Sequence, residues 1–86
     1  MVAHNFNQRD LKIHHTMHAL IRLAQRGISE ADVDNLIHTG SRRREEGIGE
    51  KGGEMWLFFK TIRGRPLVAV TEVLQPDCFV LTVKPA

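Results

Sequence analysis

The sequence has little capacity for disulfide or redox chemistry, because Cys78 is its only cysteine. A single cysteine forms neither an intramolecular disulfide nor a cysteine-based zinc cluster, and such usage is typical of a reducing compartment. No apolar run approaches the roughly 20 residues needed to span a bilayer. The first ten residues also lack the apolar core of a signal peptide. These absences predict a cytoplasmic protein with no membrane partner.

Aromatic residues and net charge are also scarce. The chain has no tyrosine, one tryptophan and four phenylalanines, which leaves few platforms for stacking single-stranded bases. The formal net charge is only +2, although eight of the twelve basic residues are arginine. Arginine suits bidentate contacts with phosphate or carboxylate groups, but genomic base composition produces the same bias. An apolar content of 42% predicts a folded domain. We expect residues 1–9 to form a flexible N-terminal tail and residues 10–86 a single domain.

Two helices are predicted in the first half of the chain. The first runs from about residue 10, with Asp10 or Thr16 as its cap, and ends at Gly27. Its apolar positions follow the helical period and are expected in the core: Ile13, Met17, Leu20, Ile21 and Ala24. Ser29 caps the second helix and Gly40 ends it. The buried stripe of this second helix consists of Val33, Leu36 and Ile37.

The second half of the chain is predicted to form β-strands. Residues 55–62, 65–74 and 78–83 are apolar segments of strand type, while the charged run 41–46 is either an edge strand or a loop. The strand residues expected in the core are Leu57, Phe59, Val68, Val70 and Val80, with Leu81 as a further candidate. The sequence therefore predicts an α+β fold, with two N-terminal helices packed on one face of a three- to four-stranded antiparallel sheet.

Three basic side chains recur along the first helix at intervals of four residues: His18, Arg22 and Arg26. An imidazole titrates near neutral pH, so His18 would serve as a general acid or base, with Arg22 and Arg26 stabilising the charge on a phosphorane. We therefore take His18 and Arg22 as catalytic candidates. The same stripe also fits a solvated helix face whose arginines pair with carboxylates, and on the helix alone this second interpretation is favoured.

Binding candidates come from the end of the first helix and from the sheet: Arg26, Lys60, Arg65, Thr82 and Lys84. Thr82 and Lys84 share one face of the last strand because alternate residues point the same way. If that face lies beneath the first helix, they would join His18 and Arg22 in one shallow cleft.

The sequence gives only weak indications of metal binding and of nucleic-acid binding. His14 and His18 lie one helical turn apart, but no further histidine or cysteine follows at a ligand-like spacing, so we expect no metal and no cofactor. The run 42–44 consists of three arginines, whose guanidinium groups would bind the phosphates of a nucleic-acid backbone. Because Glu45 and Glu46 offset its charge directly, a solvated strand edge is favoured.

The segment HALIRLAQRGIS, residues 18–29, resembles the bacterial family catalogued as domain of unknown function 4258. The resemblance continues through Gly40 to the Thr82–Val83 ending and covers about residues 14–85. The family motif falls on His18, Arg22, Arg26 and Gly27 of this chain. A distant similarity of the family to RelE-like plasmid toxins implies helices packed against an antiparallel sheet.

By analogy alone, the same resemblance implies ribonuclease activity. The small net charge and the lack of tyrosine depart from such toxins. We therefore expect a binding or partner module of toxin-like fold, with RNA or an acidic, antitoxin-like protein as its partner. A metal-independent endoribonuclease toxin is the alternative, and a purely structural role for the helix motif remains a third hypothesis.

Overall fold

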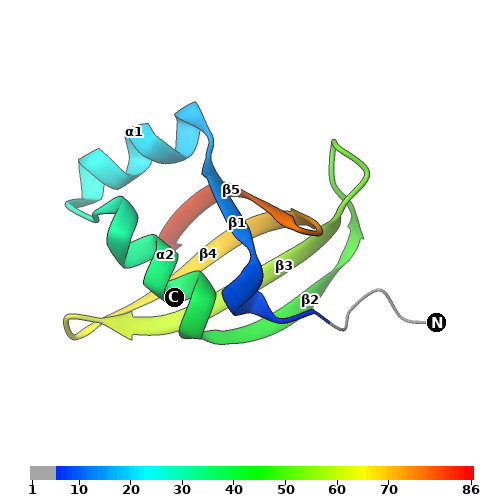
Figure 1. Cartoon of the computed structure of the whole chain (residues 1–86). Helices are drawn as coiled ribbons and strands as arrows, with labels where there is room; N and C mark the ends of the chain where they lie inside the picture. The colour runs from blue at the N-terminus through cyan, green and yellow to red at the C-terminus, as the bar shows by residue number, and fades with distance from the viewer. Residues whose placement is uncertain (1–5) are drawn as a thin grey trace.

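Five strands form one mixed sheet in the order β1-β5-β4-β3-β2 (Figure 1). The computed structural model describes residues 6–86. Its elements, in chain order, are the 3-10 helix η1 (Gln8–Asp10), β1 (Lys12–His15), α1 (Met17–Arg26), α2 (Glu30–Thr39), β2 (Ser41–Ile48), β3 (Glu54–Ile62), β4 (Arg65–Leu74) and β5 (Asp77–Pro85). Strand β1 is parallel to β5, and the other neighbours are antiparallel.

The predicted sheet of three or four antiparallel strands is wrong. The sheet has five strands, one of them parallel, and the helices lie between β1 and β2 in the chain instead of preceding every strand. The first predicted helix is too long, because residues 12–15 form a strand that pairs with residues 77–80 of β5. The four-residue spacing from Ile13 to Met17 coincides with a helical period, and four residues are too few to display a separate alternation.

The local signals at the helix ends are confirmed. Thr16 caps α1: its hydroxyl accepts a hydrogen bond from the amide of Ala19 at 3.2 Å and donates one to the carbonyl of Val80 at 2.8 Å. Gly27 ends α1 with φ of +65°, in the left-handed region that favours glycine. Ser29 caps α2 by accepting from the amide three residues on, at 3.0 Å. One residue, Thr16, thus ends β1, starts α1 and joins α1 to β5.

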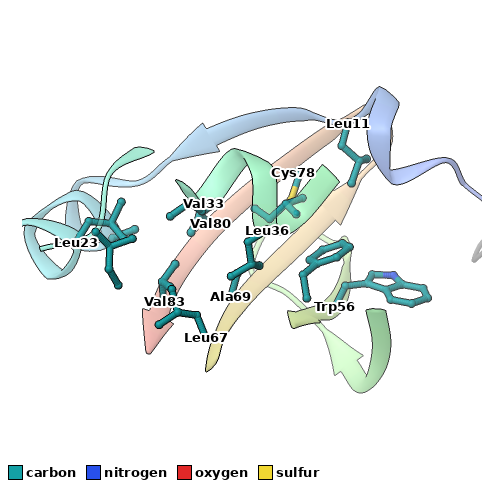
Figure 2. Close-up of a cluster of buried hydrophobic side chains, with 14 of the residues drawn as sticks. Leu11, Leu23, Val33, Leu36, Trp56, Leu67, Ala69, Cys78, Val80 and Val83 are labelled. Carbon is teal, nitrogen blue, oxygen red and sulfur yellow. The ribbon is translucent and has the colours of Figure 1, made fainter. Parts of the chain in front are cut away.

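Helix α1 is rotated relative to its predicted orientation. It buries Ala19 and Leu23, whereas Met17 and Ile21, predicted as core residues, are 73% and 51% exposed. On a helical wheel of 100° per residue, the buried direction differs from the predicted one by about a third of a turn. The stripe predicted for α2 is confirmed, since Val33, Leu36 and Ile37 are fully buried. Figure 2 shows the side chains of Leu23, Val33 and Leu36 lying against the strands.

The faces assigned to β3 and β4 are also reversed. The strand side chains in the core cluster are Trp56, Phe58, Ile62, Leu67, Ala69, Val73, Cys78, Val80 and Val83. Of the predicted strand set, Val80 belongs to this cluster, and Val68 is also buried, at 5% exposed. Leu57, Phe59 and Val70 occupy the alternate positions, on the opposite face. A shift of one residue moves every side chain to the other face. Both alternating sets in these strands are apolar, so periodicity does not distinguish them.

The start of the described chain packs on the sheet and α2. The Phe6 ring meets the Trp56 ring edge-on, with centroids 5.1 Å apart. The side-chain Nε2 of Gln8 donates to the carbonyls of Ile37 and Gly40 at 2.9 and 2.7 Å. Residues 1–5 of the expected tail lie outside the described residues. Within residues 6–86, no helix is both long and apolar enough to cross a membrane.

Candidate functional site

The outward side of α1 combines exposed apolar and basic side chains. Met17 and Ile21 lie on adjacent turns and are two of the four large apolar residues exposed in the described chain. His18 and Arg22 follow them around the helix and are also exposed. We call these four residues the α1 outer face. All ionisable side chains of α1 are basic, because its sequence MHALIRLAQR contains no aspartate or glutamate.

His18 and Arg22, the predicted catalytic pair, lie next to each other on the exposed side of α1. They lie one turn apart, which places neighbouring side chains about 6 Å from one another. Within residues 6–86, neither side chain forms a hydrogen bond or an ion pair. The expected carboxylate partners of a solvated helix are therefore missing from the described residues, and both groups remain available to an external ligand.

Arg26 and Arg65 instead form hydrogen bonds that connect the C-terminal end of α1 to the sheet. The Arg26 guanidinium donates from Nη1 to the carbonyl of Val83 in β5. Arg65 donates from Nη1 to the carbonyl of Arg26 at 3.1 Å, at the negative end of the helix dipole. These two predicted binding residues have structural roles, while their positive charge extends the basic character of α1 toward its C-terminus.

Lys60 lies elsewhere, between β3 and α2. Its Nζ donates to the Thr39 hydroxyl at 2.5 Å and to Asn35 Oδ1 at 3.3 Å. This predicted binding residue therefore links α2 to the sheet, away from His18 and Arg22.

Thr82 and Lys84 lie on the opposite face of the sheet from the helices. Thr82 pairs with Val70 and Lys84 with Val68, and both valines line a cleft on that face. Helices α1 and α2 cover the other face. The shallow cleft that was predicted to unite Thr82 and Lys84 with His18 and Arg22 is therefore not formed.

The uncovered sheet face is hollowed into a cleft of about 530 Å³, which we call the sheet trough. Its floor consists of Met55, Leu57, Phe59, Val68 and Val70, and its walls of Arg43, Glu45, Glu46, Lys84, Pro85 and Ala86. Four of the five floor residues, all but Met55, were predicted as core residues. The unbroken apolar runs of β3 and β4 signal that both faces of these strands carry apolar side chains.

Two other histidines, at positions 14 and 15, lie within hydrogen-bonding distance of aspartates. His14 Nε2 lies 2.8 Å from Asp77 Oδ1, and His15 Nε2 lies 3.0 Å from Asp34 Oδ1. Because residues 12–15 form β1, His14 and His18 do not share a helix as the metal hypothesis required. Within residues 6–86, no group of three or more histidine, cysteine, aspartate or glutamate side chains is arranged to hold a metal ion.

Cys78 has the environment of a core residue. Burial raises the pKa of its thiol from the ordinary 9.0 to about 12, and a hydrogen bond with Thr71 acts in the opposite, lowering direction. A thiol that stays protonated at neutral pH is a poor nucleophile.

A family model described as domain of unknown function (DUF4258) matches residues 15–84, nearly the whole described chain. The chain belongs to the DUF4258 family. The predicted resemblance to this family is thereby confirmed, and the matched region runs from the last residue of β1 through α1 and α2 to the penultimate residue of β5. No curated protein and no solved structure matches the chain. The DUF4258 description assigns no activity, so function has to be argued from the two surfaces described above.

Proposed function

We propose that this DUF4258 protein is a binding module that docks an acidic, amphipathic segment of a partner protein on the α1 outer face. The observation that carries the proposal is the exposure of Met17 and Ile21 beside His18 and Arg22, two basic side chains without partners in residues 6–86. An antitoxin-like partner would be of this acidic kind.

The apolar half of the α1 outer face supports a protein ligand. Burying a fully exposed methionine or isoleucine side chain contributes roughly 1.5–3 kcal/mol to binding. Met17 and Ile21 are 73% and 51% exposed. Their combined contribution is therefore on the order of 3 kcal/mol, which a partner gains by placing apolar side chains on them. A nucleic acid would use the cations but would leave both apolar side chains in water, because its backbone contacts are polar.

The basic half supports an acidic partner. His18 and Arg22 flank the apolar pair, and Arg26 and Arg65 add positive charge at the end of α1. Complementary charge accelerates association and disfavours partners of the wrong sign. Each carboxylate placed against an arginine also forms charge-assisted hydrogen bonds.

The endoribonuclease alternative rests on the same two residues. An imidazole beside a guanidinium has the chemistry for in-line attack by a 2′-hydroxyl, provided that the RNA is held in a fixed geometry. Four clefts among residues 6–86 are lined by other side chains, and His18 and Arg22 are both exposed to solvent. We therefore place binding ahead of catalysis.

The test uses a synthetic helical peptide with leucines at i, i+4 and i+7 flanked by glutamates, and measures its fluorescence anisotropy on titration with the protein. We expect Ile21→Ser to weaken binding roughly fivefold or more, because it removes an apolar contact. Arg22→Ala should weaken binding to a similar extent and flatten its salt dependence. Arg9→Ala removes an exposed arginine outside α1 and serves as the matched control, with no expected change.

Two results would contradict the proposal. Equal peptide affinity in wild type, Ile21→Ser and Arg22→Ala would show that the α1 outer face is not used. Tight binding of a single-stranded RNA that depends on Arg22 but not on Ile21 would favour a nucleic-acid ligand instead. Cleavage of that RNA, lost in His18→Ala, would establish the ribonuclease alternative.

A further inference from the structure

The sheet trough is built from cross-strand rows of side chains. One row runs from Lys84 in β5 through Val68 in β4 to Phe59 in β3. The next row runs from Thr82 through Val70 and Leu57 to Arg43 in β2. The two central strands thus supply the apolar floor, and the flanking strands supply polar walls about 14 Å apart, at ~4.8 Å per strand.

The two cations in the trough walls differ in their availability. Arg43 Nε lies 3.3 Å from Glu45 Oε2, and the Arg43 guanidinium lies over the Phe59 ring, 5.3 Å from its centroid. Lys84 is exposed and forms no hydrogen bond or ion pair within residues 6–86. One unpaired positive charge therefore stands beside the apolar floor, on the wall opposite the Arg43–Glu45 pair.

We propose that the sheet trough binds a small amphiphilic monocarboxylate, with its apolar body on the floor and its carboxylate at Lys84. The cleft volume of about 530 Å³ lies within the roughly 300–1,000 Å³ typical of small-molecule sites. An apolar floor with one convergent charge is also typical of such sites. Glu45 and Glu46 on the opposite wall disfavour a second anionic group.

This site is independent of the α1 outer face. The trough lies on the sheet face that the helices leave uncovered, whereas α1 packs on the other face through Ala19 and Leu23. A ligand in the trough and a partner on α1 therefore contact no common side chain among those named for the two surfaces.

The experiment uses decanoate below its micellar concentration, with decanol as the uncharged control, and follows backbone amide shifts by NMR titration. Decanoate should shift the amides of β3, β4 and β5 and bind about threefold to fivefold more tightly than decanol, the contribution of one exposed ionic contact. Lys84→Ala should abolish that difference, and Lys84→Arg should retain it. Lys12→Ala removes an exposed lysine at the far end of the sheet and should bind as wild type does.

The floor is tested separately by Val70→Thr, a nearly isosteric change that places a hydroxyl among the apolar side chains. This variant should weaken decanoate and decanol equally while the melting temperature stays within a few degrees of wild type. Equal binding of decanoate and decanol to the wild type, or shifts confined to α1, would overturn the proposal. Displacement of decanoate by the acidic peptide would also overturn it, because the two surfaces would then not be independent.

Discussion

Replacing Leu23 and Ile21 by alanine, one at a time, tests which side of α1 faces the core. Leu23 is 2% exposed and packs between α1 and the sheet, so Leu23→Ala should cost about 3 kcal/mol of unfolding free energy. Ile21 is 51% exposed, which halves the transfer energy lost on truncation. Alanine also has a helix propensity about 0.4 kcal/mol better than isoleucine. Ile21→Ala should therefore cost only about 0.8 kcal/mol.

Urea unfolding followed by Trp56 fluorescence measures both changes, because Trp56 is the only tryptophan and is 5% exposed in the folded chain. A chain of 86 residues is expected to have a total stability of about 4–13 kcal/mol, so the Leu23 variant remains measurable. An Ile21→Ala variant that loses as much unfolding free energy as Leu23→Ala would refute the observed orientation of α1. In that case the orientation of α1 would be the one expected from its apolar stripe, and the α1 outer face would be part of the core.

Three further predictions concern single positions. Gly27→Ala should cost about 1 kcal/mol in chemical denaturation, entirely from the left-handed backbone, because no atom lies within 4 Å of an added Cβ. Glu72→Ala should speed hydrogen exchange at Lys51 and Gly53, whose amides donate to its carboxylate at 2.9 and 2.8 Å; unchanged protection of both amides would refute this role. The raised pKa of Cys78 means that the folded thiol stays neutral while the unfolded thiol ionises near 9.0, so this group leaves stability unchanged below pH 9 and lowers it as the pH rises toward 12. Cys78→Ala should show a shallower loss of stability over that range, and an identical pH profile would contradict the assignment.

The sequence alone determined where several helices and strands of this protein begin and end. Thr16, Gly27 and Ser29 were identifiable because a cap or a left-handed turn depends on hydrogen bonds and dihedral angles within three or four residues. The residues 65–74 strand was predicted with its observed bounds, since a turn precedes it and another follows it. The family was also recognisable from residues 18–29, and the family model bears this out.

Tertiary structure decided which side of each element faces the core. In α1 the apolar stripe is wider than the contact with β5 requires, so packing of Leu23 selected the buried side and left Ile21 outside. In β3 and β4 both alternating sets are apolar, and the covering helices selected Phe58 over Leu57. The residues 12–15 strand exists only because β5, more than sixty residues later, offers a free edge. Such choices depend on contacts between segments that are distant in the chain, and for that reason local periodicity could place neither the α1 outer face nor the sheet trough.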